Sequence, residues 1–165
     1  MEDVIRIKPH HVVDILTSFG RGLRFEPHPY GHAVHTVAAR LLADPEVLLE
    51  MELGADDICA PCVHNVDGSC DDVIDTSYRP AAPPRKREWN LLLDRRWCER
   101  LGIDPGDRLT GRQFCERLRG RAGDIADLYR EMPPDHTADR AANLRRGIDK
   151  ALGSTAGPDQ SEERK

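Results

Sequence analysis

The sequence predicts a mostly helical α+β fold, with about five or six helices and a minor two-stranded β element. Two observations lead to this prediction. Apolar residues recur at helical spacing over most of the chain, and the short runs that suit a strand lie only in its N-terminal third. A chain of 165 residues is expected to form one domain, here residues 1–152, and the polar residues 153–165 are expected to be a disordered tail.

The N-terminal part is expected to contain both strands and two helices. Residues 4–8 alternate apolar and polar side chains and predict the first strand. Pro9 suits the first position of a helix, and residues 10–19 continue it with an amphipathic pattern. After a loop rich in glycine and proline, a second helix is expected at about 31–43. Residues 47–53 suit either a helical turn or a strand that pairs with the first one, and we favour the strand.

The C-terminal half is predicted to be helical. Residues 79–88 are extended, basic and rich in proline, which is typical of a mobile surface connection. One helix is expected at 89–101, where a glycine closes it, and another after Thr110, whose side chain suits an N-cap. Residues 124–132 and 135–152 predict two further helices, separated by a pair of prolines.

Charge and hydropathy argue against two classes of partner. A net charge of −5 does not suit a domain that binds nucleic acid through a broad basic surface. No apolar run approaches membrane length, and the polar start of the chain does not resemble a signal peptide. We therefore expect a cytoplasmic protein that acts on a small-molecule substrate or meets a redox partner protein, without nucleic-acid or membrane partners. The sequence leaves the oligomeric state open.

Three cysteines carry the strongest chemical signal in the sequence. Cys59 and Cys62 are separated by two residues, and Cys70 follows closely, a spacing that lets one loop offer several thiolates to a soft metal centre. In a reducing compartment such a cluster indicates a metal site more often than a disulfide framework. A redox pair or plain core thiols are the alternative. Cys98 and Cys115 lie outside the cluster and are expected to pack in the core.

The first helix offers candidates to complete such a centre. His10, His11 and Asp14 stand three and four residues apart, so each histidine can share a helical face with the aspartate. We expect this face to complete the centre, with Asp14 either touching the metal or only orienting the two histidines. Capping or solvated positions are the alternative for all three. His64, close behind the cysteine pair, is expected at the loop surface, although it could also be a ligand or a proton donor beside the site.

Two further groups of residues have less specific expectations. His28, His32 and His35 form a second histidine face, which more often is solvated or packed than a second metal site, but which could line a substrate pocket. The basic run at residues 85–87 could bind an anionic substrate, although an exposed basic loop is the simpler expectation.

Several motifs in order resemble the bacterial domain of unknown function 1284. The resemblance is carried by residues 7–16, 56–62, Cys70, 91–96 and 101–107, and it spans about residues 4–120. Members of that family open with Pro-His-His-Leu-Leu-Cys and carry a later Asp-Asp-Ile-Cys-x-x-Cys-Pro loop with a further cysteine. The family is described as iron–sulfur binding, without a settled activity. This chain differs from it at one informative position, where Asp14 replaces the first cysteine.

The resemblance implies a [4Fe-4S] cluster held by Cys59, Cys62 and Cys70. The fourth iron would then face Asp14, solvent or substrate, and since carboxylate is a harder and weaker ligand for such iron than thiolate, this corner should exchange readily. An open corner suits non-redox Lewis-acid chemistry, such as removal of water or sulfur from a small molecule by a lyase or hydrolase, with His10 and His11 moving protons. The alternatives are a ferredoxin-like electron carrier and a binding module stabilised by Zn²⁺.

Overall fold

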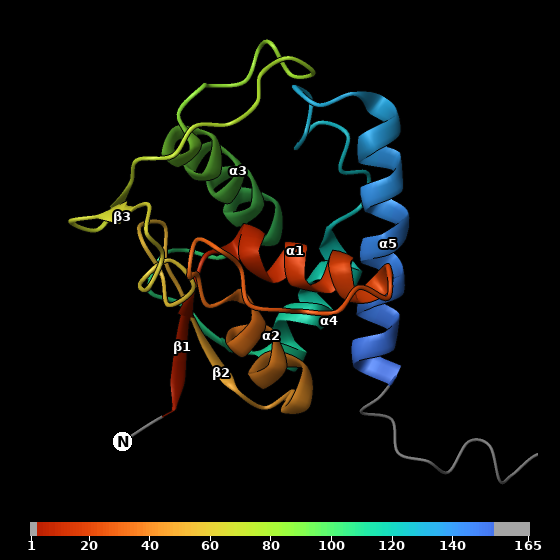
Figure 1. Cartoon of the computed structure of the whole chain (residues 1–165). Helices are drawn as coiled ribbons and strands as arrows, with labels where there is room; N and C mark the ends of the chain where they lie inside the picture. The colour runs from red at the N-terminus through yellow and green to blue at the C-terminus, as the bar shows by residue number, and fades with distance from the viewer. Residues whose placement is uncertain (1–2, 154–165) are drawn as a thin grey trace, which may run out of the picture.

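The computed structural model of the chain describes residues 3–153 and has the mostly helical α+β fold that the sequence predicts (Figure 1). The described residues form five helices: α1 (Pro9–Gly20), α2 (Val34–Ala43), α3 (Lys86–Leu101), α4 (Gly111–Arg121) and α5 (Pro134–Gly153). Residue 153 ends α5, and the rest of the predicted tail, 154–165, lies outside the described residues. None of these helices is long and apolar enough to cross a membrane.

The strands form two small sheets. β1 (Val4–Ile7) pairs in parallel with β2 (Leu48–Met51), which confirms the predicted strand pair. β2 also pairs in antiparallel fashion with β5 (Arg108–Thr110), so this sheet has three strands where two were predicted. The sequence did not predict β5, because three residues are too few to show a clear alternation of apolar and polar side chains. The second sheet is a hairpin of β3 (Asn65–Val66) and β4 (Ser69–Cys70), inside the cysteine loop.

Helix α1 lies at the centre of the packing. Its buried apolar face consists of Val12, Val13, Ile15 and Leu16. The C-terminal end of α1 crosses α5 (Figure 1) at Gly20 and Gly147, and a Cβ on Gly147 would overlap the carbonyl oxygen of Leu16. The other end of α1 lies against α3. The contact with α5 fixes one end of α1, and the contact with α3 positions its first turn, which carries the two histidines.

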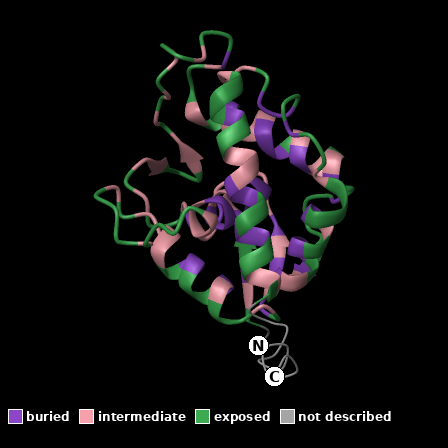
Figure 2. Cartoon of the chain, turned by 90° about the vertical axis from the view of Figure 1, so that its right-hand side faces the viewer, coloured by how far each residue is buried: buried purple, intermediate pink, exposed green. Residues whose placement is uncertain are grey.

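The helices of the C-terminal half begin and end largely as expected. Thr110 caps α4: its hydroxyl accepts the N–H of Gln113 at 3.1 Å, and the Gln113 side chain accepts the N–H of Thr110 at 2.9 Å. Gly102 ends α3 with a φ of 66°, in the left-handed region that favours glycine. Figure 2, which looks onto α5, shows exposed residues on the outward side of the helices and buried residues turned toward the interior.

The predicted helix at 124–132 is wrong, because these residues form consecutive turns. The Asp124 carboxylate accepts a main-chain N–H two residues further on, which starts a tight turn. Two main-chain carbonyls also accept hydrogen bonds from arginines of α3. Arg100 donates to the carbonyl of Asp124 and Arg96 to that of Leu128, both at 2.9 Å. Side chains from α3 therefore take acceptors that a helix would keep for its own N–H groups.

Two helix boundaries also differ from the prediction. α2 begins at Val34 rather than near residue 31, since Gly31 has a φ of 74°. α3 begins at Lys86, inside the stretch 79–88 that was expected to be an extended surface connection. Within that stretch Ala82 is only 5% exposed, so the connection is both shorter and better packed than predicted. The basic run consequently lies at the first turn of a helix.

Candidate metal centre

A cavity of about 430 Å³ opens between the first turn of α1, the cysteine loop and the start of α3. All six site residues predicted from the sequence line it: His10, His11, Asp14, Cys59, Cys62 and Cys70. They come from segments up to 60 positions apart in the chain, so the fold brings the predicted histidine face and the predicted cysteine loop to one place. The cavity is large enough for a small molecule beside the cysteines.

The first two cysteines are held by a tight turn. The N–H of Cys62 donates to the carbonyl of Cys59 at 2.9 Å, which closes the turn over Ala60 and Pro61. The loop that precedes α2 braces both sides of this turn through two main-chain hydrogen bonds. The N–H of Val63 donates to the carbonyl of Tyr30 at 2.8 Å, and residue 33 donates to residue 58 at 3.0 Å. These contacts keep both thiols half-buried at the cavity.

The hairpin β3–β4 returns Cys70 to the same place. Its turn residues Asp67 and Gly68 have φ values of 51° and 83°, the left-handed pair that a two-residue hairpin with a primed turn requires. Asn65 pairs with Cys70 across the hairpin, and its N–H donates to the carbonyl of Cys62 at 3.0 Å. The turn chemistry therefore sets Cys70 beside the Cys59–Cys62 turn.

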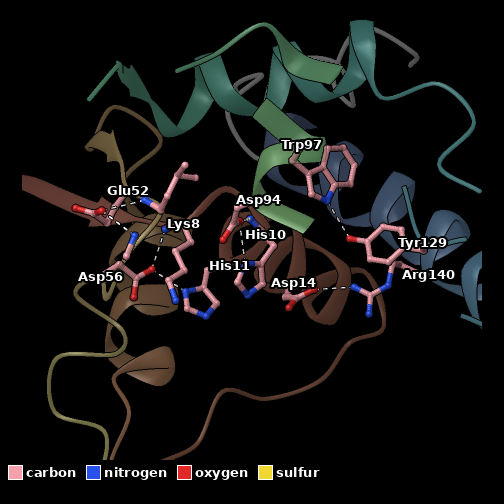
Figure 3. A network of polar contacts seen from close by, with 12 residues as sticks. Lys8, His10, His11, Asp14, Glu52, Asp56, Asp94, Trp97, Tyr129 and Arg140 are labelled. Atoms are coloured by element: carbon pink, nitrogen blue, oxygen red, sulfur yellow. Dashed lines mark hydrogen bonds and ion pairs between the residues drawn. The ribbon is translucent and has the colours of Figure 1, made fainter. Parts of the chain in front are cut away.

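A buried carboxylate, Asp56, joins α1 to the cysteine loop (Figure 3). It accepts the N–H of Lys8 at 2.8 Å, the N–H of Cys59 at 3.0 Å and a hydrogen bond from Nδ1 of His11 at 2.6 Å. Burial by itself raises the pKa of Asp56, but the charge and hydrogen bond of His11 and the two main-chain donors together bring it well below its usual range. Asp56 is therefore ionised and orients the imidazole of His11.

A second buried carboxylate, Asp94 of α3, orients the imidazole of His10. Its Oδ1 lies 2.8 Å from Nδ1 of His10 and also accepts the main-chain N–H of His10 at 2.8 Å. It thus satisfies a free donor in the first turn of α1, where the helix dipole favours a negative charge. Sequence reasoning did not assign Asp56 or Asp94 to the site. The available signal for Asp94 was weak, because it directly follows the apolar residues 91–93 but stands before two arginines, as an ordinary surface carboxylate would.

The environments of the two histidines move their pKa values in opposite directions. Burial lowers the pKa of His10, but the charge and hydrogen bond of Asp94 outweigh it and raise the value overall. For His11, burial and the charge of His10, whose ring centroid lies 4.3 Å away, outweigh Asp56 and lower the pKa. Both rings use Nδ1 for a carboxylate, which leaves Nε2 available for other chemistry. Such a pair can divide the roles of acid and base.

Asp14 lines the cavity, but its carboxylate forms an ion pair with Arg140 of α5. Its Oδ1 accepts a hydrogen bond from Nη1 of Arg140 at 2.6 Å, and the guanidinium of Arg140 lies over the ring of Tyr129. Figure 3 shows this ion pair on the far side of His10 from Asp56. The carboxylates bonded to the two histidines are thus Asp94 and Asp56, not Asp14.

One group of possible metal ligands is already close together. Donor atoms of His11, Asp56 and Cys59 lie within 4.8 Å of one another. However, Nδ1 of His11 and Oδ2 of Asp56 are hydrogen-bonded to each other, so the donors that can turn to a metal are Nε2 of His11 and the sulfur of Cys59. Burial and the charge of Asp56 raise the pKa of Cys59 to about 11. A bound cation would favour the thiolate that burial disfavours.

The other candidate residues have more ordinary positions. His64 is hydrogen-bonded to Asp71 at 2.8 Å, and His32 stacks on His28, but both His64 and His32 also line the cavity. Cys115 is buried in the core, as predicted, and Cys98 is partly buried against it. Comparison of the chain with protein-family models, with curated proteins and with solved structures finds no match.

Proposed function

We propose that this protein is an iron–sulfur protein that binds one [4Fe-4S] cluster through Cys59, Cys62 and Cys70. The observation that carries the proposal is that these three thiols, none of them in a disulfide, line one cavity together with two histidines. Three half-buried sulfur donors suit a soft metal centre better than a hard cation. The tight turn and the hairpin that gather them support the proposal, because they hold the sulfurs without help from a metal.

The same cavity supports non-redox chemistry on a small molecule, such as removal of water or sulfur. A cluster with three protein thiolates supplies one iron that can polarise a substrate oxygen or sulfur. Since Asp14 is already paired with Arg140, we propose that this iron is open to substrate rather than held by Asp14. His10, with its raised pKa, would donate a proton from its Nε2. His11, with its lowered pKa, would accept a proton at its own Nε2. A cavity beside the cysteines, with both histidines in its wall, favours this role over that of an electron carrier, which needs no substrate pocket.

A zinc-stabilised binding module is the second candidate. The observation that favours it is the proximity of His11, Asp56 and Cys59, since imidazole and thiolate are typical zinc ligands. The hydrogen bond between His11 and Asp56 reduces the number of free donors in this group, which is why we prefer the cluster.

The proposed compartment is the cytoplasm. All five cysteines are free thiols in the structure, and a clustered set of free thiols suits a reducing environment. A four-iron cluster exposed to a cavity would also need protection from oxidants.

Metal analysis of anaerobically purified protein tests the proposal. We expect about four iron and four sulfide per chain, which is the stoichiometry of a [4Fe-4S] cluster, and little zinc. Cys62→Ser should lose most of the iron and sulfide, whereas the matched control Cys98→Ser, a half-buried cysteine outside the cavity, should keep them. Zinc without sulfide would instead establish the binding module, and a metal-free protein under anoxic handling would contradict both.

A further inference from the structure

We infer that the molecule bound in this cavity carries an anionic group, a carboxylate or a phosphate, and that Arg79 and Arg87 bind it. The inference rests on the proposed function only in taking the cavity as the place where the substrate reacts. Its own evidence is the distribution of charge on the cavity wall and the way in which the two arginines are held.

The cavity wall has an excess of positive charge. Five basic residues line it: Lys8, Arg79, Lys86, Arg87 and Arg140. The two acidic lining residues are each taken by one of them, because Asp14 pairs with Arg140 at 2.6 Å and Asp72 with Lys86 at 3.3 Å. Among the described residues, no carboxylate lies within ion-pair distance of the other three. The chain as a whole has a net charge of −5, so the wall is opposite in sign to the rest of the protein, as expected where an anion binds.

Arg79 is held in place without being neutralised. Its Nε donates to the carbonyl of Asp75 at 2.8 Å, and its guanidinium lies 4.9 Å from the ring centroid of Tyr78 and 5.6 Å from that of Trp89. Nη1 also donates to the sulfur of Met132 at 4.0 Å, so the groups in direct contact with the guanidinium are uncharged, and the Asp75 carboxylate interacts with it only from beyond ion-pair distance. The guanidinium therefore keeps its capacity to bind an anion through paired N–H donors.

Arg87 links the basic run to the cysteine hairpin. Its Nη1 donates to the hydroxyl of Ser69 at 3.3 Å, in β4 and one residue before Cys70. This neutral partner leaves the charge of Arg87 uncompensated. Because α3 begins earlier than the sequence predicts, Arg87 lies in the first turn of a helix beside the cavity, rather than in an extended loop. The two arginines thus come from different segments, and both line the cavity that contains the proposed metal ligands.

The positive wall could instead serve only to balance the negative charge of cluster thiolates. The two explanations differ in a measurable way. If the charge only balances the cluster, the loaded protein should not bind a small anion, whereas a substrate site should bind one with the cluster in place.

Titration of the full-length, anaerobically loaded protein tests the inference. The probes are inorganic phosphate and succinate, at constant ionic strength, with succinamide as a neutral analogue of succinate. We expect one or both anions to bind by calorimetry and succinamide not to bind. Binding should also change the fluorescence of Trp89, which lines the cavity, because the only other tryptophan, Trp97, is fully buried and bonded to Tyr129. Phosphate binding alone would indicate a phosphate ester, and succinate binding alone a carboxylate.

The variants assign the binding to these residues. Arg87→Gln and Arg79→Gln should each raise the Kd about tenfold, the effect of losing one hydrogen bond to a charged group. Arg85→Gln is the matched control, because Arg85 is exposed, belongs to the same basic run and does not line the cavity. Arg79 also packs on Trp89, so the exposed Arg87 provides a variant that should not disturb folding.

Two results would overturn the inference: no binding of either anion to the loaded protein, or equal weakening by the Arg85 and Arg87 variants. Measuring iron and sulfide in the same samples separates the two proposals. Full cluster content without anion binding would overturn this inference alone. Binding that depends on Arg87 in protein without iron or sulfide would instead overturn the cluster and leave the anion site in place.

Discussion

At the scale of single residues, the neighbouring His10 and His11 differ although each has a buried aspartate. Both rings hydrogen-bond a carboxylate through Nδ1, at 2.8 and 2.6 Å. Two imidazolium ions with centroids 4.3 Å apart repel each other, so the first proton bound disfavours the second. The pair therefore titrates in two steps, which lets one ring hold a proton while the other accepts one.

The first prediction concerns these two steps. In metal-free protein, NMR of labelled histidine should give two apparent pKa values on either side of the ordinary value of about 6.5, the higher one dominated by His10. Asp94→Asn removes the charge that raises the pKa of His10, so the higher value should fall. Asp71→Asn, which removes the carboxylate bonded to His64 instead, is the control and should leave both values unchanged. Titration of both rings together near 6.5 would contradict the proposed division of roles.

The second prediction concerns a buried ion pair between α3 and the turns at 124–132. Arg96 donates to both carboxylate oxygens of Glu131, at 2.6 and 2.8 Å, and both side chains are largely buried. We expect Glu131→Gln to lower the free energy of unfolding at pH 7 by about 1.5–3 kcal/mol, the range for a hydrogen bond to a charged group. Urea denaturation measures this loss. Glu116→Gln, at an exposed position of α4, is the control and should have little effect.

The same ion pair should make stability depend on pH. The hydrogen bonds and charge of Arg96 lower the pKa of Glu131 in the folded protein. The stabilisation is therefore fully present above the unfolded-state pKa, about 4.5, and is lost as the pH falls through the folded-state value. Between pH 7 and pH 3 the wild type should lose more stability than Glu131→Gln. An equal loss in both would show that the pair does not contribute to acid unfolding.

At the scale of elements, hydrophobic periodicity and capping residues correctly predicted the helices whose formation depends on neighbouring residues in the sequence. The α1 pattern after Pro9, the Thr110 cap and the long α5 are confirmed, because capping and amphipathic spacing act within a few residues. The segment 124–132 has a helical pattern too, but its carbonyls are taken by side chains of α3 that are about 30 positions away in sequence. No local pattern reports such competition, so this prediction was wrong.

The third prediction tests the crossing of α1 and α5. A Cβ at Gly147 would overlap the backbone of Leu16, and backbone cannot move aside as a flexible side chain can. We expect Gly147→Ala to lower the free energy of unfolding by about 1–3 kcal/mol or more, the effect of an overpacked core. Gly120→Ala is the matched control in α4, where a Cβ would meet nothing within 4 Å. It should be neutral or stabilise the protein by less than about 1 kcal/mol, because alanine favours a helix over glycine but Gly120 lies in the last turn of α4. Comparable melting temperatures for the two variants would show that the helices do not cross this closely.

At the scale of the whole molecule, the sequence predicted which cysteines and histidines line the cavity, but not the buried carboxylates that orient the two histidines. The spacing of the three cysteines and of the histidine pair, together with the resemblance of the motifs around them, led us to expect these residues in one place, and all of them line the cavity. Asp94 could not be assigned because it lies 84 positions from His10, and its role depends on how α3 packs against α1. The positive wall of the cavity likewise depends on the unexpected start of α3.

The last prediction concerns residues 54–85, which contain the cysteine loop and few of the buried apolar residues. Residues 54–85 contribute only Ile58 and Ala82 to the buried apolar residues, and their only strands are two of two residues each (Figure 1). Most of the core comes from the sheet, the helices and the turns at 124–132, so this segment should have low local stability. If the three thiols hold a cluster, its binding energy should stabilise this segment more than any other.

Hydrogen exchange measured by mass spectrometry tests that expectation. Cluster loss, by anaerobic chelation or by Cys62→Ser, should speed exchange in residues 54–85 by about tenfold or more, equivalent to a loss of about 1.4 kcal/mol of local stability. Exchange in α4 and α5 should stay unchanged, and Cys98→Ser should behave like the wild type. The first turn of α1 should respond weakly, because it is joined to the loop through Asp56. Faster exchange throughout the chain would mean that the whole fold depends on the metal, and no change anywhere would mean that the loop does not hold one.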